Sequence, residues 1–203
     1  FGLDTRPGNP EEGERSATII IASLNRENNE VRLCSVFRDT LLQQDDGSYN
    51  KANAAYSFGG PDEAVAMLNK NLDLDLQHYA PVNFNALVDV IDELGGIELD
   101  LTSEEVFWTN GYCTETSRVT GKTTTELTQP GKQILDGVQA TSYCRIRYTQ
   151  GDDFKRAERQ RTVLEQIVKK AQTADLTTIN KIIDKVFPMI ETNFSLTEIL
   201  AYA

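Results

Sequence analysis

Arginine side chains gather in one short stretch of the chain, "SYCRIRYTQGDDFKRAERQR" (142–161). Of the eleven arginines in the sequence, five fall in these twenty residues: Arg145, Arg147, Arg156, Arg159 and Arg161. A guanidinium group is planar, stays charged and binds phosphate oxygens in pairs, so it holds a phosphate or pyrophosphate better than a lysine does. The stretch therefore predicts a site for a small anionic ligand.

The first spacing in this stretch is that of a strand. "YCRIRY" (143–148) is rich in β-branched and aromatic residues, and residues two apart on a strand lie on the same face. We therefore expect Arg145 and Arg147 to project together.

The second spacing is that of an amphipathic helix over 152–173, with Asp152 or Asp153 as its N-cap. Its apolar stripe, traced back toward the N-terminus, reaches three polar residues: Gln160, Arg159 and Arg156. A helix N-terminus also favours anions. These residues are therefore predicted to face the same anionic ligand, whereas Arg161 is predicted to lie on the surface.

A different explanation is that the arginines pair with some of the thirty-one carboxylates of the chain. The formal net charge of −11 excludes a broad nucleic-acid surface but not one local basic pocket. A further arginine, Arg38 in "FRDT", follows a predicted strand, and a local pair with Asp39 would explain it equally well.

The elements that position these residues predict a mixed fold. We expect an α/β domain with three layers, α/β/α, around a mixed, largely antiparallel sheet, in a single domain over 1–203. Residues 102–131 lack periodicity and are expected to form a polar excursion. The remaining elements are strands at 18–25, 31–37, 74–84 and 96–101, and helices at 61–72, 85–94, 131–143, 178–190 and 195–203.

Cys113 and Cys144 flank a polar segment and could form a disulfide that closes it, in an oxidising compartment. The other possibility is that all three cysteines are free thiols.

The chain opens on "FGLDTRPG", without an initiator methionine, and has no apolar run of the roughly eighteen residues that a membrane span needs. We expect a soluble ectodomain whose membrane anchor lies outside this chain.

Eight motifs occur in an order that is similar to one known family. They are "GLDTR", "RSAT", "FRDT", "KANAAYSFGGPDEAV", "HYAPVNF", "ELGGIELDL", "GKQILDGVQATSYCRIR" and "DDFKRAERQ". Together they resemble the LytR–CpsA–Psr family of bacterial cell-wall enzymes over nearly the whole chain. The resemblance implies a phosphotransferase anchored at the extracytoplasmic face of the membrane. It would move an anionic glycopolymer, such as a teichoic acid, from a polyprenyl-pyrophosphate carrier to peptidoglycan.

The resemblance also implies roles for individual residues. The implied catalytic residues are Arg38, Arg145, Arg147, Asp153 and Arg156, and the implied substrate-binding residues are Arg15, Arg159 and Gln160. The general base stays open between Asp39 and Asp153.

The metal site is where this sequence departs from the family. The family implies Mg²⁺ or Mn²⁺ held by two aspartates, of which Asp4 is present, whereas Ala17 of "RSAT" stands where the second is expected. Loss of one carboxylate should weaken binding of a hard dication. Either the alanine was introduced to trap a ligand, which we favour, or the chain is a natural copy that binds without catalysing. The alternatives to a transferase are thus a non-catalytic binder of polyprenyl phosphates and a polyprenyl-pyrophosphate phosphatase.

Overall fold

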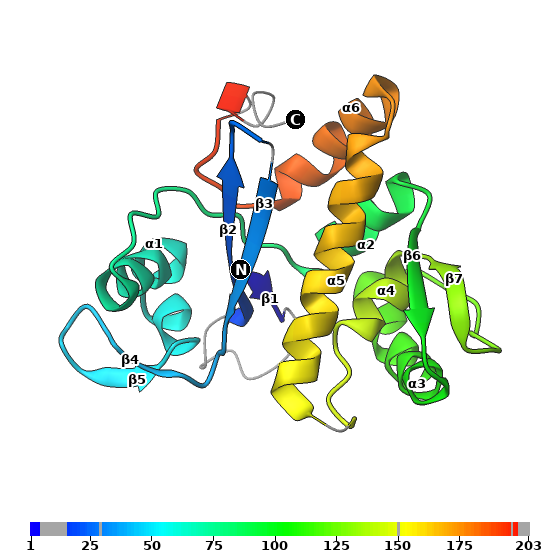
Figure 1. Cartoon of the computed structure of the whole chain (residues 1–203), viewed down its shortest axis with the longest axis horizontal. Helices are drawn as coiled ribbons and strands as arrows, with labels where there is room; N and C mark the ends of the chain where they lie inside the picture. The colour runs from blue at the N-terminus through cyan, green and yellow to red at the C-terminus, as the bar shows by residue number, and fades with distance from the viewer. Residues whose placement is uncertain (5–15, 29, 150, 196, 199–203) are drawn as a thin grey trace. The chain divides into compact units, whose positions relative to one another are not determined.

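The computed structural model describes residues 1–4, 16–28, 30–149, 151–195 and 197–198 (Figure 1). The chain divides into two units, Phe1–Asn83 with Glu191–Ala203, and Phe84–Ile190. Both combine helices with antiparallel strand pairs, which confirms the α/β class with a largely antiparallel arrangement. The single domain stays a prediction.

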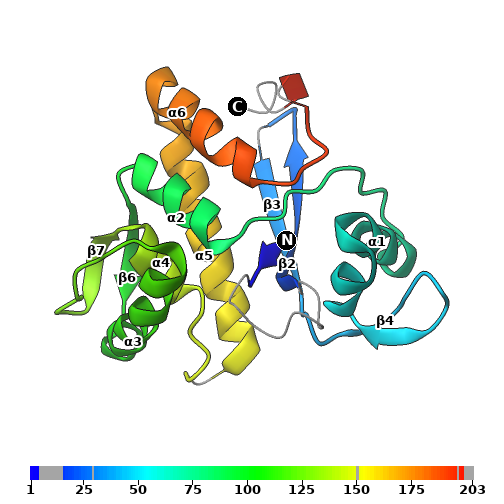
Figure 2. The same ribbon diagram turned by 180° about the vertical axis from the view of Figure 1, so that it is seen from behind.

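The first unit is built on the predicted hairpin. β2 (Ser16–Asn25) and β3 (Glu30–Val36) pair antiparallel from Ile19 opposite Val36 to Asn25 opposite Glu30, and lie side by side in Figures 1 and 2. β1 (Gly2–Leu3) adds to the other edge of β2, so the strand order is β1-β2-β3. The hairpin prediction is confirmed.

Helix α1 (Ala54–Leu72) begins earlier than expected and is interrupted. Gly59 and Gly60 have non-helical backbone angles, and the helix resumes at Pro61, where the sequence predicted it to start. The stretch before α1 also contains a small hairpin of β4 (Leu41–Gln43) and β5 (Tyr49–Lys51).

The strand expected at 74–84 is wrong. The backbone N–H and C=O of Leu76 are instead bound by the side-chain amide of Asn69, at 2.7 and 2.9 Å. Only Val82 makes a β-bridge, to Gly2. The alternation of polar and apolar residues at 74–84 therefore predicted a strand where, apart from this one bridge, no strand among the described residues pairs with the segment. The core of this unit is Leu3, Ile19, Ala52, Ala55, Tyr56, Ala64, Met67 and Leu68.

The second unit opens with α2 (Phe84–Glu93). Two glycines with positive φ, Gly95 and Gly96, follow this helix, and Gly95 was predicted to end it. β6 (Ile97–Leu101) alternates buried and exposed residues and pairs antiparallel with β7 (Gly131–Leu135). The segment predicted as a helix at 131–143 is thus a strand followed by the short helix α4 (Gly137–Tyr143).

The polar segment 102–131 is not aperiodic, because most of it is helix α3 (Ser103–Thr120). A capping box starts this helix: Thr102 accepts from the N–H of Glu105, and the Glu105 side chain accepts from the N–H of Thr102. Its buried residues include Thr109 and Thr116. Because the buried face is partly polar, apolar residues do not recur at helical spacing, and the sequence pattern did not predict this helix.

Three helical elements complete the unit: α5 (Asp152–Gln172), α6 (Leu176–Val186) and η2 (Phe187–Met189). The N-cap of α5 is Gly151, without a side-chain cap, so the aspartate cap is wrong. The helix expected at 195–203 lies largely outside the described residues. The core contains Ile91, Ile97, Leu99, Leu101, Val106, Leu127, Leu135, Ala140, Tyr143, Ile146 and Val163.

Cys34, Cys113 and Cys144 are free, so of the two possibilities considered the structure shows the free thiols and not a Cys113–Cys144 disulfide. Burial raises the pKa of both Cys113 and Cys144, the latter to about 12, which keeps these thiols protonated at neutral pH. Over the described ranges, no helix is long and apolar enough to cross a membrane.

Candidate active site: buried arginines around the turn after α4

Arg145 and Arg147 lie in a turn, not on a strand. The N–H of Arg145 donates to the carbonyl of Ser142 at 3.0 Å, so the chain curls on from the end of α4. Arg145 is consequently buried while Arg147 is exposed, and the two side chains do not share a face. The prediction from strand spacing is wrong because this local turn replaces the extended backbone.

Arg145 is held against α3. Its guanidinium donates to the carboxylate of Glu115 and, at 2.9 Å, to the hydroxyl of Thr116. It also lies 4.9 Å from the ring centre of Phe84 and 5.1 Å from that of Tyr112. Two aromatic faces and one carboxylate thus stabilise a cation away from water.

Arg159 of α5 contacts the opposite end of α3. Its Nε donates to Glu105 at 2.9 Å and its Nη2 to the hydroxyl of Thr149 at 2.8 Å. Burial, with Glu105 nearby, raises the pKa of Tyr143, whose ring lies 5.7 Å from this guanidinium. Glu105 and Glu115 are ten residues apart, which is about 15 Å along a helix. Because Arg159 binds the first and Arg145 the second, these two guanidinium groups do not converge on one point.

Arg156, Arg159 and Gln160 gather around Cys144. The Gln160 side chain donates to the carbonyl of Cys144 at 3.4 Å, and both guanidinium groups act against burial by lowering the pKa of this thiol. Arg156 also lies 3.9 Å from Asp153. As predicted, Arg156 and Arg159 are buried on the inward face of α5, and Gln160 is half-buried.

Two features of the second unit leave positive charge available for a ligand. Arg147 is exposed, and no described residue gives it a hydrogen bond or an ion pair. Nη1 of Arg159 is buried without a hydrogen-bond partner in the described part of the chain. A buried donor without an acceptor is unfavourable, so an anion beside it would lower the free energy.

In the first unit, Arg38 follows β3 and lies 3.3 Å from its neighbour Asp39, which confirms the local pair considered above. The Asp39 carboxylate also accepts from Lys51 at 2.7 Å, and this hydrogen bond, against burial, holds the pKa of Asp39 below its usual range. The carbonyl of Arg38 accepts from the N–H of Asn53, so the loop after β5 is tied to this turn.

The metal-binding prediction concerns β1 and β2. Gly2 is opposite Thr18 and Leu3 is opposite Ser16, so Ala17 is the extra residue of a bulge, one position from the partner of Leu3. Asp4 follows Leu3 directly and is half-buried. Arg15 lies outside the described residues.

The alternative that the arginines pair with carboxylates holds for Arg145 and Arg159, but the sequence did not identify their partners. These are the acids Glu105 and Glu115, the hydroxyl of Thr116, and the rings of Phe84 and Tyr112. The capping-box pattern at 102–105 was a usable signal for the start of α3, whereas nothing local marks Glu115, which is thirty residues from Arg145.

Residues 1–203 match the family model described as the LytR_cpsA_psr family. The chain belongs to this family. A curated relative, the polyisoprenyl-teichoic acid–peptidoglycan teichoic acid transferase TagV of Bacillus subtilis (strain 168), is 33% identical over 192 residues, which is 92% of this chain and 47% of TagV. TagU of Enterococcus faecalis (strain ATCC 700802 / V583), named as the same transferase, is 35% identical over 84% of this chain and 52% of TagU.

Solved structures of family members share the fold. "TagT bound to LIIa-WTA" superposes with a TM-score of 0.77 at 25% identity, over 98% of this chain and 69% of that one. The crystal structure of B. subtilis TagV gives 0.76 at 29% identity, over 99% and 75%. This LytR_cpsA_psr chain spans about half the length of TagV and TagU.

Proposed function

We propose that this LytR_cpsA_psr chain is the catalytic domain of a phosphotransferase that moves an anionic glycopolymer from a polyprenyl-pyrophosphate carrier to peptidoglycan. The family match over the whole chain carries this proposal, because relatives such as TagV and TagU are named as transferases of this type. The proposed location is the extracytoplasmic face of a bacterial membrane, with the anchor outside this chain.

In the proposed reaction, an acceptor hydroxyl on peptidoglycan attacks the phosphorus atom that carries the glycopolymer. A new P–O bond forms, the P–O bond to the bridging oxygen of the pyrophosphate breaks, and polyprenyl phosphate leaves with the electron pair. Arg147 and the Nη1 donor of Arg159 would hold the phosphate oxygens, because neither is satisfied within the described chain. Positioning and charge stabilisation supply most of the acceleration in phosphoryl transfer.

Arg145 and Arg156 are proposed as further members of the same site, while the catalytic role implied for Arg38, in the first unit, stays a prediction. The guanidinium of Arg145 is already paired with Glu115. We therefore propose that Arg145 acts by fixing the turn that carries Arg147. Arg156 is likewise already paired with an acid, because Asp153 lies 3.9 Å from its guanidinium.

The base that takes the proton of the acceptor hydroxyl is proposed to be Asp153. Asp39 is the weaker candidate, because Lys51 keeps its carboxyl pKa low and a low pKa makes a poor base. Asp153 is exposed at the start of α5, where an incoming acceptor can reach it.

The described residues do not fit a tightly bound dication. No three His, Cys, Asp or Glu side chains gather within the described ranges, and Ala17 has no side-chain oxygen. Asp4 follows β1 directly, and Ala17 lies one position from the partner of Leu3 on β2, so we propose that an aspartate at position 17 would supply the missing second carboxylate.

The test compares the chain with its Ala17→Asp variant. We expect the variant to bind Mn²⁺ at least tenfold more tightly by titration calorimetry, and to transfer glycopolymer from a synthetic polyprenyl-pyrophosphate donor to peptidoglycan faster than the original chain. Asn50→Asp, which adds the same charge on exposed β5, is the matched control and should change neither. Equal transfer by all three chains would contradict the proposal.

The second candidate is a non-catalytic binder of polyprenyl phosphates, which Ala17 favours. It predicts tight lipid binding without turnover in both the original chain and Ala17→Asp. Analysis of the products separates the third possibility, a phosphatase, since water would then replace the sugar as acceptor.

A further inference from the structure

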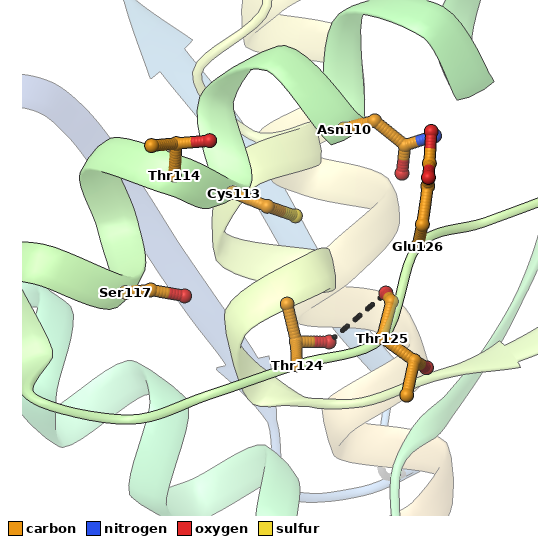
Figure 3. Close-up of a pocket in the computed structure, with 7 residues that line it drawn as sticks. All are labelled: Asn110, Cys113, Thr114, Ser117, Thr124, Thr125 and Glu126. Carbon is orange, nitrogen blue, oxygen red and sulfur yellow. Dashed lines mark hydrogen bonds between the residues drawn. The ribbon is translucent and has the colours of Figure 1, made fainter.

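A cavity of about 400 Å³ lies in the second unit, between α3 and the extended segment 122–127 (Figure 3). Asn110, Cys113, Thr114 and Ser117 form one wall, at the helical spacing of a single face. Figure 3 shows Cys113 and Ser117 directed from α3 toward the segment. The volume is within the range of sites for small organic ligands.

The second wall is an irregular segment that is nevertheless tied down along its length. The amide of Asn110 exchanges two hydrogen bonds with the backbone of Leu127, at 2.8 and 3.0 Å. The carbonyl of Thr125 accepts from Gln139 at 2.9 Å, and Thr124 donates to Asp136. The cavity is therefore already formed without a ligand, which reduces the entropy lost on binding.

The other end of this segment is fixed by charge. Lys122 donates to Asp89 and, at 2.9 Å, to Asp92, both on α2. Because these lysine donors are already engaged, they do not make the cavity basic, and its lining contains no Lys, Arg or His side chain.

The lining chemistry selects a neutral ligand rich in hydroxyl groups. The hydroxyls of Thr114 and Ser117 and the carboxylate of Glu126 make no hydrogen bond or ion pair with any described residue. A carboxylate accepts hydrogen bonds from neighbouring hydroxyls but repels an anion, and hydroxyls both donate and accept. A phosphate would find no cation here, and a single carboxylate is too little to hold a dication.

The cavity is connected to the arginine site through buried hydrogen bonds. Cys113 is hydrogen-bonded to Ser142, whose hydroxyl donates to Thr116 at 2.9 Å, and Arg145 donates to the same Thr116 oxygen at 2.9 Å. Tyr112, which faces Arg145, lies about 200° around the helix from Asn110 at 3.6 residues per turn. The cavity and Arg145 thus lie on opposite faces of one helix, whose diameter with side chains is about 10–12 Å.

We propose that this cavity binds one neutral sugar residue of a glycan, on the face of α3 that points away from Arg145. The inference rests on the proposed function, which supplies a glycan as donor or acceptor. It assigns the glycan a contact separate from the one proposed for its pyrophosphate.

The experiment titrates the isotope-labelled chain with chitotetraose, a neutral oligosaccharide of four N-acetylglucosamine residues, and follows backbone amides by NMR. We expect a millimolar Kd and shifts confined to residues 113–117 and 124–126. The double variant Thr114→Val with Ser117→Ala should raise Kd at least tenfold, since two hydrogen bonds are lost. Thr123→Val, an exposed change in the same segment outside the lining, should leave Kd unchanged.

Glu126→Gln is a second variant, on an exposed residue whose replacement leaves the fold intact, and it should raise Kd at least threefold. No binding, shifts at other residues, or an unchanged Kd in these variants would overturn the proposal. Methylammonium is a small cation. Equal shifts with methylammonium at the same concentration would contradict the proposal that the cavity prefers a neutral ligand.

A parallel titration with farnesyl pyrophosphate separates this inference from the proposed function. Sugar binding without pyrophosphate binding would defeat only the proposed function. Pyrophosphate binding without sugar binding would defeat only the inference.

Discussion

The ion pair between Arg159 and Glu105 offers a direct test of how the buried arginines are held. The change is Glu105→Gln, which removes the negative charge and keeps the size of the side chain. Glutamine also serves at this position of a capping box, so the start of α3 should remain intact. What changes is the charge that faces the buried guanidinium.

The expected loss follows from the burial of the pair. The Arg159 side chain is 5% exposed and that of Glu105 is 14% exposed, with 2.9 Å between Nε and Oε1. Removing one partner of a buried pair costs about 3–5 kcal/mol. Arg159 keeps its hydrogen bond to Thr149 and its contact with Tyr143, so we expect about 3 kcal/mol. For a chain of this length that corresponds to a Tm lower by roughly 6–12 °C.

The measurement is urea or thermal unfolding, monitored by circular dichroism. The matched control is Glu104→Gln, an exposed acid in the same first turn, which should lose only the helix-dipole contribution of about 0.3–1 kcal/mol. In the background of Glu105→Gln, a second change, Arg159→Met, should recover stability, because the uncompensated charge is removed as well.

Two results would refute this reasoning. One is a Glu105→Gln variant that loses no more stability than Glu104→Gln. The other is a double variant that is less stable than Glu105→Gln alone. Inorganic pyrophosphate gives a functional readout: it should raise the Tm of Glu105→Gln more than that of the original chain, because the anion replaces the lost charge beside Arg159.

Other predictions concern stability and reactivity. Burial alone would raise the pKa of Asp89, but hydrogen bonds from lysines, Lys122 first, outweigh it and hold the pKa low. Its contribution to the free energy of unfolding is therefore present above about pH 4 and is lost as the pH falls through the lower folded-state pKa. Lys122→Met should reduce this fall of the unfolding free energy with decreasing pH. Exposed Cys34 should be the one thiol that iodoacetamide alkylates in the native chain, read as one mass increment, against three after denaturation. Gly137→Ala would place a Cβ 2.3 Å from the carbonyl oxygen of Val88 and should lower the unfolding free energy by about 2–3 kcal/mol, whereas Gly111→Ala, with nothing within 4 Å, should raise it by about 0.5–1 kcal/mol.

Local patterns in the sequence determined several elements of this protein. Apolar runs separated by a polar turn predicted the β2–β3 hairpin, and the 3.6-residue period predicted α5 together with the inward placement of Arg156 and Arg159. These features depend on residues within a few positions of one another, so one sequence contains the information. The ordered motifs also identified the family, because eight of them in sequence are specific even where each is not.

Long-range contacts decided the rest. The turn at Arg145 and Arg147 follows from the end of α4 and from α3, whereas the two alternating arginines by themselves are typical of a strand. Glu105 lies 54 residues before Arg159, so the sequence contained both groups but not their pairing. The hydroxyl-lined cavity likewise depends on hydrogen bonds that tie 122–127 to α2, α3 and the start of α4. An irregular segment has no period of its own, so its shape depends on the side chains that anchor it.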